Sequence, residues 1–304
     1  MRIRARPIAP GRATGTALVH PEPFSFVGGV DPSTGELLHP TPSASGGALA
    51  GRVFAFPHGK GSTVGSYVLY GLGRRGVGPA AIVNARAEAI VAVGAVLAGI
   101  PMVDRVDVGG IRSADRVTVD GDRGAVDLPD VRARPVVSAI LRNRGRILIV
   151  RRSEAVGSFR GRWSAVSGYI EGREDPRDRA VREVREETGL RRLVLRATGQ
   201  PVFARTDATV YVVHPFLFDV ASRTIRLDWE NTDHAWIRLE DLGRYDTVPR
   251  LADVVASVLP AAASVPTPPS PRPRDGVRRT RSPGRPGRPR ARAASSAVHR
   301  RRTG

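Results

Sequence analysis

The chain has 304 residues, 41% of them hydrophobic, and it contains no cysteine. At roughly 100–200 residues per domain, this length predicts two domains with room for a tail. The formal net charge of +19 excludes an acid-rich surface and makes nucleic acids and anionic small molecules candidate partners. Without cysteine, the chain by itself forms no disulfide and offers no thiolate to an iron–sulfur cluster.

Two observations argue against a membrane protein. The segment Met1–Gly15 is rich in arginine and proline and lacks the apolar region of a signal peptide. The most apolar stretch, Ile90–Ile100, has 11 residues, whereas a membrane-spanning helix needs about 20. We therefore expect a soluble cytoplasmic protein that does not contact membranes.

Residues 1–129 form a first block in which strand and helix patterns alternate. The apolar runs predict strands at 16–20, 52–57, 80–83, 101–103 and 116–120, and a helix over 88–98. Such alternation is typical of a layered α/β domain. Prolines and alternating charges at 130–135 then predict a linker.

Residues 136–260 form a second block, which opens with a hairpin. Strands are expected at 136–141 and 147–150, around a turn at 142–145. A helix is predicted over 176–188, with Asp175 as its N-cap, Pro176 at its first position and Gly189 ending it. The remaining patterns predict a central strand at 209–220, a neighbouring strand at 224–229, and helical segments at 239–242 and 248–258.

The remaining segment, 261–304, differs sharply in composition. It holds 12 arginines and one acidic residue, Asp275, and 8 of the 25 prolines. Such a segment buries too little apolar surface to offset the entropy lost on ordering, so we expect a disordered tail. Its charge is compatible with weak, nonspecific contact with nucleic acid, although no aromatic side chain is interleaved for base stacking. A compositional extension without function is the alternative.

The most specific motif begins at Gly168 and continues through Glu174 to the sequence REVREETGL at 182–190. On a helix, Glu183, Glu186 and Glu187 share one face, because side chains three and four residues apart are neighbours. Like charges so placed repel each other unless a cation neutralises them. Carboxylate oxygens without histidine or cysteine suit a hard ion, Mg²⁺ or Mn²⁺. The alternative is a solvated acidic face paired with nearby arginines.

This pattern resembles the Nudix box, and the likeness extends over residues 136–250. The resemblance implies an α/β/α sandwich in which metal-activated water attacks a diphosphate. It implies that Glu183, Glu186 and Glu187 hold the metal and that Glu186 is thereby catalytic. Glu174 would support the loop and help position water, and Arg182 would orient the carboxylates. The motif does not specify the substrate.

Two arginines and a tryptophan precede this motif in the sequence. Arg151 and Arg152 end the second strand of the hairpin, where their guanidinium groups could bind phosphate. Ordinary surface arginines are the alternative. Trp163 is interpreted as a packing residue rather than as a platform for a nucleobase.

In the first block, the strand at 52–57 runs into a glycine-rich loop and then into a helix expected from Ser66. Gly61 and its neighbouring glycines allow backbone amides to approach a ligand, and a helix N-terminus favours an anion. Lys60, the single lysine of the chain, adds positive charge there. Ser62 and Ser66 are candidates for chemistry and substrate binding, or alternatively for capping the helix.

Residues 24–104 resemble the swivel domain of aconitase X, which also forms the small subunit of archaeal phosphomevalonate dehydratase. The resemblance rests on FSFVGGVD at 24–31, GRV at 51–53, PHGKGSTVGSY at 57–67, GPAAI at 78–82 and GIP at 99–101. It implies a β/β/α swivel domain of a lyase that dehydrates a hydroxy acid such as 5-phosphomevalonate in isoprenoid synthesis. Ser62 would act as the base, and Lys60, Gly61 and Ser66 would bind a small phosphorylated substrate.

A dehydratase of this type uses an iron–sulfur cluster, which a chain without cysteine cannot hold. The swivel domain would therefore need a separate, larger, cysteine-bearing subunit as its partner in a heterodimer. The resulting hypothesis is a bifunctional chain in which a dehydratase small subunit is fused to a Nudix hydrolase. In one alternative the swivel domain only binds or regulates. In another, the protein is a nucleic-acid-associated nucleotide hydrolase.

Overall fold

Two eight-stranded sheets organise residues 1–39 and 47–259, which are the residues that the computed structural model describes. The strand order of the first sheet is β1-β8-β7-β3-β4-β5-β6-β2, and β3, β4, β5 and β6 run parallel in its centre. The strands are β1 (Arg2–Arg4), β2 (Arg6–Ala9), β3 (Arg12–Val19), β4 (Val53–Phe56), β5 (Ala81–Asn84), β6 (Met102–Asp104), β7 (Arg116–Asp120) and β8 (Ala125–Asp127).

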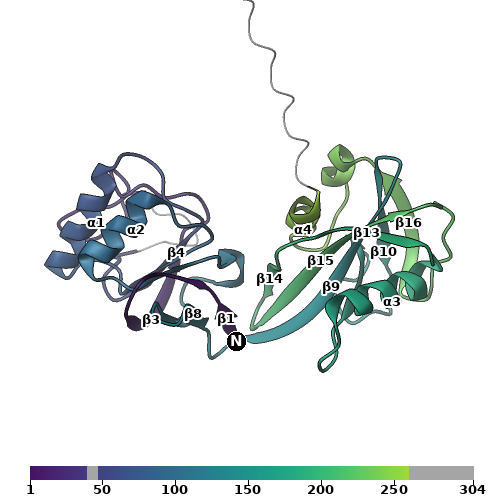
Figure 1. Ribbon diagram of the computed structural model, residues 1–304, viewed down its shortest axis with the longest axis horizontal. Coiled ribbons are helices and arrows are strands. Elements are labelled where there is room, and N and C mark those ends of the chain that lie inside the picture. Colours follow the sequence, from purple (N-terminus) through teal and green to yellow (C-terminus); the bar gives the residue numbers. More distant parts are fainter. Residues whose placement is uncertain (40–46, 260–304) are drawn as a thin grey trace, which may run out of the picture. The chain divides into compact units, whose positions relative to one another are not determined.

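Helices α1 (Val64–Arg75) and α2 (Ala89–Ala98) lie side by side over one face of this sheet (Figure 1). Phe54 and Phe56 of β4 point into the core beneath these helices, whereas Val53 and Ala55 belong to the core on the opposite face. This alternation follows from the two-residue period of a strand. Because apolar cores cover both faces, all four residues of β4 are buried.

The second sheet has the order β11-β10-β9-β15-β13, with β12 also paired to β9, β14 to β15 and β16 to β10. Its two longest strands, β9 and β15, run parallel through the centre. The strands are β9 (Arg132–Asn143), β10 (Arg146–Arg152), β11 (Trp163–Ser164), β12 (Val166–Tyr169), β13 (Leu193–Thr198), β14 (Val202–Thr206), β15 (Thr209–Val220) and β16 (Asn231–Ile237).

Helix α3 (Pro176–Thr188) has the bounds that the sequence predicts. The Asp175 side chain accepts hydrogen bonds from the backbone amides of Arg177 and Asp178, and Gly189 ends the helix at a φ of 72°. Ala180 and Val184 pack α3 on the sheet, together with Val137 and Phe218. Helix α4 (Leu251–Val258) packs elsewhere, with Ile140 and Leu217 in a separate core cluster.

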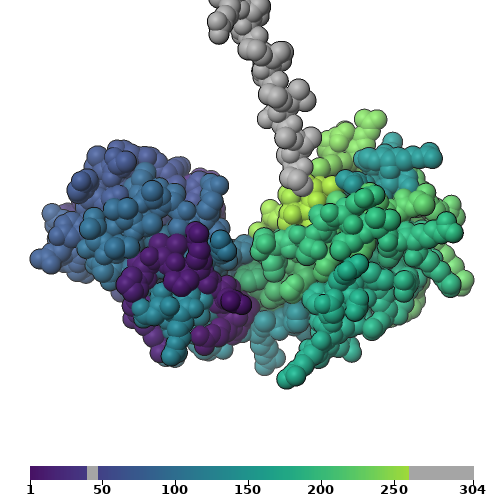
Figure 2. Space-filling view, in the orientation of Figure 1, coloured from purple at the N-terminus to yellow at the C-terminus, as the bar shows by residue number. Residues whose placement is uncertain are grey.

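The structure corrects two expectations and supplies strands that the sequence patterns did not reveal. Residues 224–229 form no strand; Ile225 and Leu227 pack into the α3 core while Arg226 N donates to Thr188 O. Residues 132–135, expected in a linker, begin β9, because they pair with the start of β15. Strands β1 and β2 lie in the arginine-rich N-terminal segment, where β1 pairs with β8 (Figure 2, purple beside teal).

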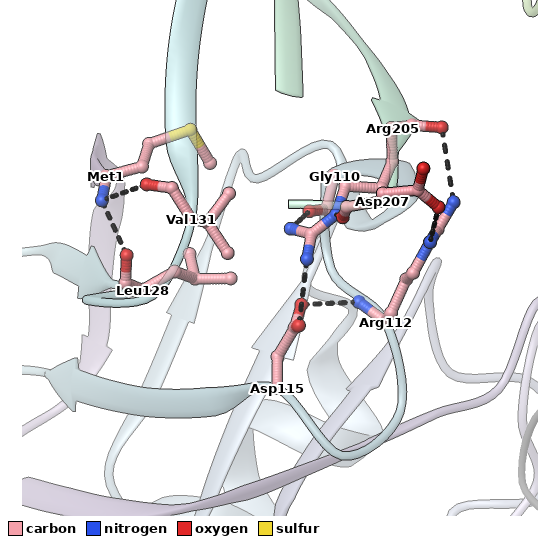
Figure 3. A network of polar contacts seen from close by, with 8 residues as sticks. All are labelled: Met1, Gly110, Arg112, Asp115, Leu128, Val131, Arg205 and Asp207. Atoms are coloured by element: carbon pink, nitrogen blue, oxygen red, sulfur yellow. Dashed lines mark hydrogen bonds and ion pairs between the residues drawn. The ribbon is translucent and has the colours of Figure 1, made fainter. Parts of the chain in front are cut away.

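Contacts join the two sheets within a single compact unit. The Met1 ammonium donates to the carbonyl oxygens of Leu128 and Val131, at 2.5 and 2.8 Å, and so ties the N-terminus to the segment between β8 and β9. The Arg205 guanidinium reaches Asp115 Oδ1 at 2.9 Å and Gly110 O at 3.3 Å (Figure 3). The Arg205 side chain is only 8% exposed, so this ion pair is a buried cross-link between residues far apart in sequence.

The tail expected at 261–304 lies outside the described residues. Within residues 1–39 and 47–259, none of the helices combines the length and apolar character that crossing a membrane requires.

Candidate functional site

The three glutamates of α3 have different environments. Glu183 and Glu187 are 4% and 3% exposed, whereas Glu186 is exposed. The two buried carboxylates follow from the helix period, because positions 183 and 187 lie on the face that also buries Ala180 and Val184. This helix face is therefore both a packing surface and an acidic surface.

Hydrogen bonds from two other elements hold Glu187. Its Oε1 accepts from Ser167 N at 3.1 Å, and its Oε2 accepts from the Asn231 side-chain amide at 2.7 Å. Burial raises the pKa of Glu187 well above the ordinary glutamate value, and the neighbouring charges of Glu183 and Glu230 raise it further. A group with these surroundings is stabilised by neutralisation, through either a proton or a cation.

Glu183 lies against Gly168 of β12. A Cβ atom at position 168 would overlap the Glu183 carboxylate, so the glycine is what lets this carboxylate lie against the sheet. Arg179, one turn earlier on α3, forms an ion pair with Glu183. Burial raises the pKa of Glu183. The positive charge of Arg179 opposes this rise, and the negative charge of Glu186 adds to it.

Glu230 is a fourth carboxylate at this centre, and the sequence reasoning did not single it out. It precedes β16, and its charge raises the pKa values of Glu183 and Glu187, while the charge of Glu186 raises the pKa of Glu230. Burial is the main cause of its raised pKa, followed by Asp228. Glu230 directly precedes Asn231, whose side chain donates to Glu187. This link between the start of β16 and α3 shows that Glu230 belongs to the site, and the sequence alone does not reveal it.

The donor chemistry of these side chains fits a hard divalent cation, because all the candidate ligands are carboxylate oxygens that repel one another. In the described part of the chain, however, no three His, Asp or Glu side chains are grouped as a cation site. Arg179 and Asn231 instead bind Glu183 and Glu187. Metal ligation would therefore require at least the Arg179 guanidinium to move away.

Arg182, expected to orient the carboxylates of α3, instead forms an ion pair with Glu174, with Arg182 Nη1 at 2.8 Å from Glu174 Oε1. Glu174 lies in the loop before α3, and its side chain is 16% exposed. Arg182 therefore ties that loop to the helix. The expected role of Glu174 in supporting the loop and positioning water stays a prediction.

A cavity of about 290 Å³ opens beside Glu183 and Glu230. Gly168 and Arg152 lie on its polar side, near the carboxylates. Most of the remaining wall is apolar, formed by Val136, Val137, Ala155, Val156, Phe159, Ala165, Ala204, Val213, Val248, Pro249, Leu251 and Val254. The cavity therefore places a charged end and an apolar body in one space, as ligand sites commonly do.

Ser164 carries one of the unpartnered polar atoms of this wall, as does Arg179 at its Nε. Ser164 is 3% exposed, and its buried Oγ has no hydrogen-bond partner among the described residues. Leaving a buried hydroxyl unpaired is unfavourable by about 1–3 kcal/mol. Trp229, 68% exposed, and Tyr211 contribute aromatic surface to the same cavity.

The arginines at the end of β10 separate into two roles. Arg152 lines the cavity and donates to Ser158 O at 3.0 Å, and its charge acts on Glu230. Arg151 is exposed, is absent from the cavity wall and donates to Gly161 O at 3.1 Å. Trp163 packs edge-on against Tyr245 at 5.1 Å between ring centroids, in agreement with its interpretation as a packing residue.

The second candidate region is the loop between β4 and α1. Gly61 has a φ of 101°, and Lys60 N donates to Phe24 O at 2.9 Å, which fixes the loop beside residues 24–26. Lys60 and Ser62 are exposed. Ser62 Oγ accepts only a long bond, 3.3 Å, from Val64 N, so its hydroxyl remains accessible at the start of α1.

Ser66 does not join this group. The helix begins at Val64 rather than at Ser66, with Thr63 as its N-cap residue, so the alternative in which Ser66 caps the helix is wrong. Its buried hydroxyl donates to Ile90 O of α2 at 2.8 Å. The structure thus makes Ser66 a link between the two helices and leaves Lys60, Gly61 and Ser62 as the accessible set.

Comparison with known proteins matches both halves of the chain. Residues 2–128 match the model of the aconitase X swivel domain, and residues 132–258 match that of the NUDIX domain. The phosphomevalonate dehydratase small subunit of Pyrococcus furiosus is 49% identical over 128 residues, which are 42% of this chain and 96% of that protein.

Two solved structures are each similar to part of the chain. Aconitase X from Thermococcus kodakaraensis in its holo-form is 44% identical, with a TM-score of 0.41, over 42% of this chain and 98% of that one. The MutT protein of Methanosarcina mazei Go1 is 26% identical, with a TM-score of 0.37, over 41% of this chain and 91% of that one.

The two folds and their acidic and glycine-rich sites thus define an enzyme that combines a Nudix hydrolase domain with a dehydratase small-subunit domain. The chain belongs to the aconitase X swivel family, and it carries a Nudix domain in the same polypeptide.

Proposed function

We propose that the C-terminal domain hydrolyses a diphosphate with the help of Mg²⁺ or Mn²⁺. The cavity beside the buried carboxylates supports this proposal most directly, because it joins an acidic centre to a space for the rest of a substrate. In the reaction, the oxygen of water bonds to one phosphorus and the bridging P–O bond breaks. The products are two phosphate-bearing molecules, and one proton is released.

Each group of the site has a part in this proposal. Glu183, Glu186 and Glu187 would hold the cation, whose charge would supply stabilisation of phosphate oxygens and a more acidic water. Glu230, whose pKa burial raises, accepts the proton of the attacking water. Arg152 faces the cavity and orients a phosphate through its guanidinium.

The apolar wall defines the other end of the substrate. An uncharged, largely apolar group fits there, and a polar atom on that group would satisfy Ser164 Oγ. Inorganic pyrophosphate lacks any such group and should be a poor substrate. Nucleoside and prenyl diphosphates both offer an apolar body, and a nucleobase in addition offers polar atoms.

A substrate panel tests the hydrolase proposal. The full-length chain would be incubated with Mg²⁺ and with nucleoside triphosphates, ADP-ribose, dimethylallyl diphosphate, geranyl diphosphate or inorganic pyrophosphate, and products would be quantified. We expect hydrolysis of at least one organic diphosphate and little of pyrophosphate. Failure to hydrolyse any of them, with EDTA-treated protein as the blank, would contradict the proposal.

We further propose that the N-terminal domain is the small subunit of a dehydratase acting on 5-phosphomevalonate. The relatives that carry this name support the substrate. Ser62 would remove the proton from carbon as the hydroxyl group leaves as water, and Lys60 would bind the phosphate or carboxylate. Since the chain has no cysteine, the iron–sulfur cluster would belong to a large partner subunit.

Co-expression tests this second activity. The chain and a cysteine-rich large subunit from the same organism would be co-purified anaerobically and assayed with 5-phosphomevalonate. We expect activity only when both are present. If both proteins fold but do not associate, the domain is a binding module rather than a dehydratase subunit.

A further inference from the structure

Strands β14 and β15 form a wall with a different environment on each face. Ala204 and Tyr211 line the hydrolase cavity. Phe203 and Val210, their neighbours in sequence, are buried in a core cluster shared with the first sheet. Because successive residues of a strand point to opposite faces, these strands separate the hydrolase cavity from the swivel-domain core by a single layer of backbone.

Asp107, in the loop after β6, holds this wall from the swivel side. Its Oδ2 accepts a hydrogen bond from Phe203 N at 2.7 Å and one from Arg250 Nη1 at 2.6 Å. Its Oδ1 accepts from Gly109 N at 3.0 Å, which fixes the orientation of the carboxylate. One swivel-domain side chain thus bonds to two separate segments of the hydrolase domain.

Arg250 connects Asp107 to helix α4, which lies beside the cavity. It immediately precedes α4 and has a φ of 64°, a left-handed conformation that non-glycine residues rarely adopt. Its guanidinium also donates to Phe203 O at 2.8 Å and to Asp253 Oδ2 at 2.8 Å. The next residue, Leu251, lines the cavity, as does Val254 one turn later.

Two glycines make the close approach possible. A Cβ atom at Gly109 would overlap the Arg250 guanidinium, and one at Gly110 would lie 2.6 Å from Phe203 Cδ2. The loop at 107–110 is therefore shaped to fit the hydrolase domain, and the contact with Arg250 and Phe203 leaves no space for larger residues.

We propose that Asp107 is a positioning residue of the hydrolase site, acting through Arg250 and β14. By holding the start of α4 and one strand of the wall, it keeps the apolar part of the cavity in the shape that binds the substrate. The hydrogen bonds of Asp107 and Arg250 join them to each other and to Gly109, Phe203 and Asp253, not to the carboxylates, so the effect concerns substrate binding rather than the chemical step. The kinetic part of this inference rests on the proposed hydrolase function.

The test compares full-length Asp107→Asn with Arg112→Ala. Arg112 is the matched control because it also joins the two domains, through Asp207 at 3.8 Å and Arg205 O at 3.5 Å, but does not touch Arg250. Hydrogen–deuterium exchange would be measured for peptides covering 202–206 and 248–258. We expect Asp107→Asn to speed exchange there on the order of tenfold, as loss of a charge-assisted hydrogen bond allows, and Arg112→Ala to leave exchange at 248–258 unchanged.

Kinetics on the best substrate of the panel provide the second readout. For Asp107→Asn we expect KM to rise about tenfold while kcat stays within about twofold, the pattern of lost uniform binding. A fall in kcat at constant KM, or equal effects in both variants, would overturn the proposal. If the unmodified chain hydrolyses nothing on the panel, the hydrolase function fails, and exchange at 202–206 and 248–258 still decides whether Asp107 holds the wall.

The variant Arg250→Gly distinguishes the effect of the backbone conformation at position 250 from the effect of the Arg250 side chain. Glycine adopts the left-handed conformation at position 250 without strain, so this variant should fold, yet it cannot bond to Asp107. We expect it to reproduce the KM of Asp107→Asn, and the double variant to be no worse than either single one. Normal KM in Arg250→Gly would show that the contact has no positioning role.

Discussion

Gly168 lies directly against the carboxylate of Glu183, so the strand before α3 has no space for a side chain where it faces the buried acid. The glycine that begins the motif is therefore a steric partner of a residue 15 positions later. Its importance comes from the space it leaves for Glu183 rather than from its flexibility.

Gly168→Ala should consequently displace Glu183 or β12. We expect a loss of stability of about 1–3 kcal/mol, the usual range for overpacking, together with loss of most diphosphate hydrolysis. Thermal unfolding and the substrate panel would measure both. Gly243→Ala is the control, since nothing lies within 4 Å of a Cβ atom there, and a comparable loss in that variant would contradict the steric explanation.

Glu186→Gln should separate activity from stability. Glu186 is exposed, and its charge raises the pKa of Glu183. We expect hydrolysis to fall by at least about 10²-fold because a metal ligand is lost, while the melting temperature holds or rises slightly. Glu171→Gln, at an exposed residue of the preceding loop, should retain activity. Near-full activity of Glu186→Gln would show that Glu186 is not a metal ligand of the hydrolase site.

The stability of the metal-free protein should depend on pH in a specific direction. Burial raises the pKa values of Glu187, Glu183 and Glu230 in the folded state, so the folded chain binds more protons than the unfolded chain. The contribution of these protonated carboxylates to the free energy of unfolding is therefore fully present below the ordinary glutamate pKa. It is lost as the pH rises through their raised pKa values. Melting temperatures from pH 5 to 8 without metal should fall with pH.

Glu187→Gln should flatten this dependence, because it removes the most buried of the three carboxylates. Saturating Mg²⁺ should also restore stability at the upper end of the range, since a ligand that binds only the folded state stabilises it. A pH profile that is unchanged in Glu187→Gln would mean that other groups cause the dependence.

Ser62 and Ser66 form a matched pair of alanine substitutions. Ser66→Ala removes the hydrogen bond to Ile90 O and should destabilise the fold by about 1 kcal/mol with little effect on dehydratase turnover. Ser62→Ala should leave the melting temperature unchanged and abolish turnover in the complex with the large subunit. Turnover by Ser62→Ala in an assembled complex would exclude this serine as the base.

Local sequence signals predict much of the fold. Asp175, Pro176 and Gly189 define α3 because capping depends on residues within one turn of the helix ends. The run at 209–220 likewise predicts β15 with its full bounds. The strand expected at 224–229 fails because alternating Ile225 and Leu227 also suit an extended segment that packs on α3 without pairing.

The candidate site is predictable only where one element supplies it. Glu183, Glu186 and Glu187 follow from the period of a single helix. Glu230, Asn231 and the cavity wall depend on pairing between distant strands, which residue spacing does not encode. Ser66 was misplaced for a related reason, since its partner Ile90 lies on another helix.

The glycines at 109 and 110 have a consequence for how this polypeptide can change over time. A side chain at either position would meet a residue of the other domain, namely Arg250 or Phe203. Substitutions in that swivel-domain loop are thus limited by the hydrolase, and substitutions at 203 or 250 by the swivel domain. At this contact, a change in either domain is therefore constrained by the other.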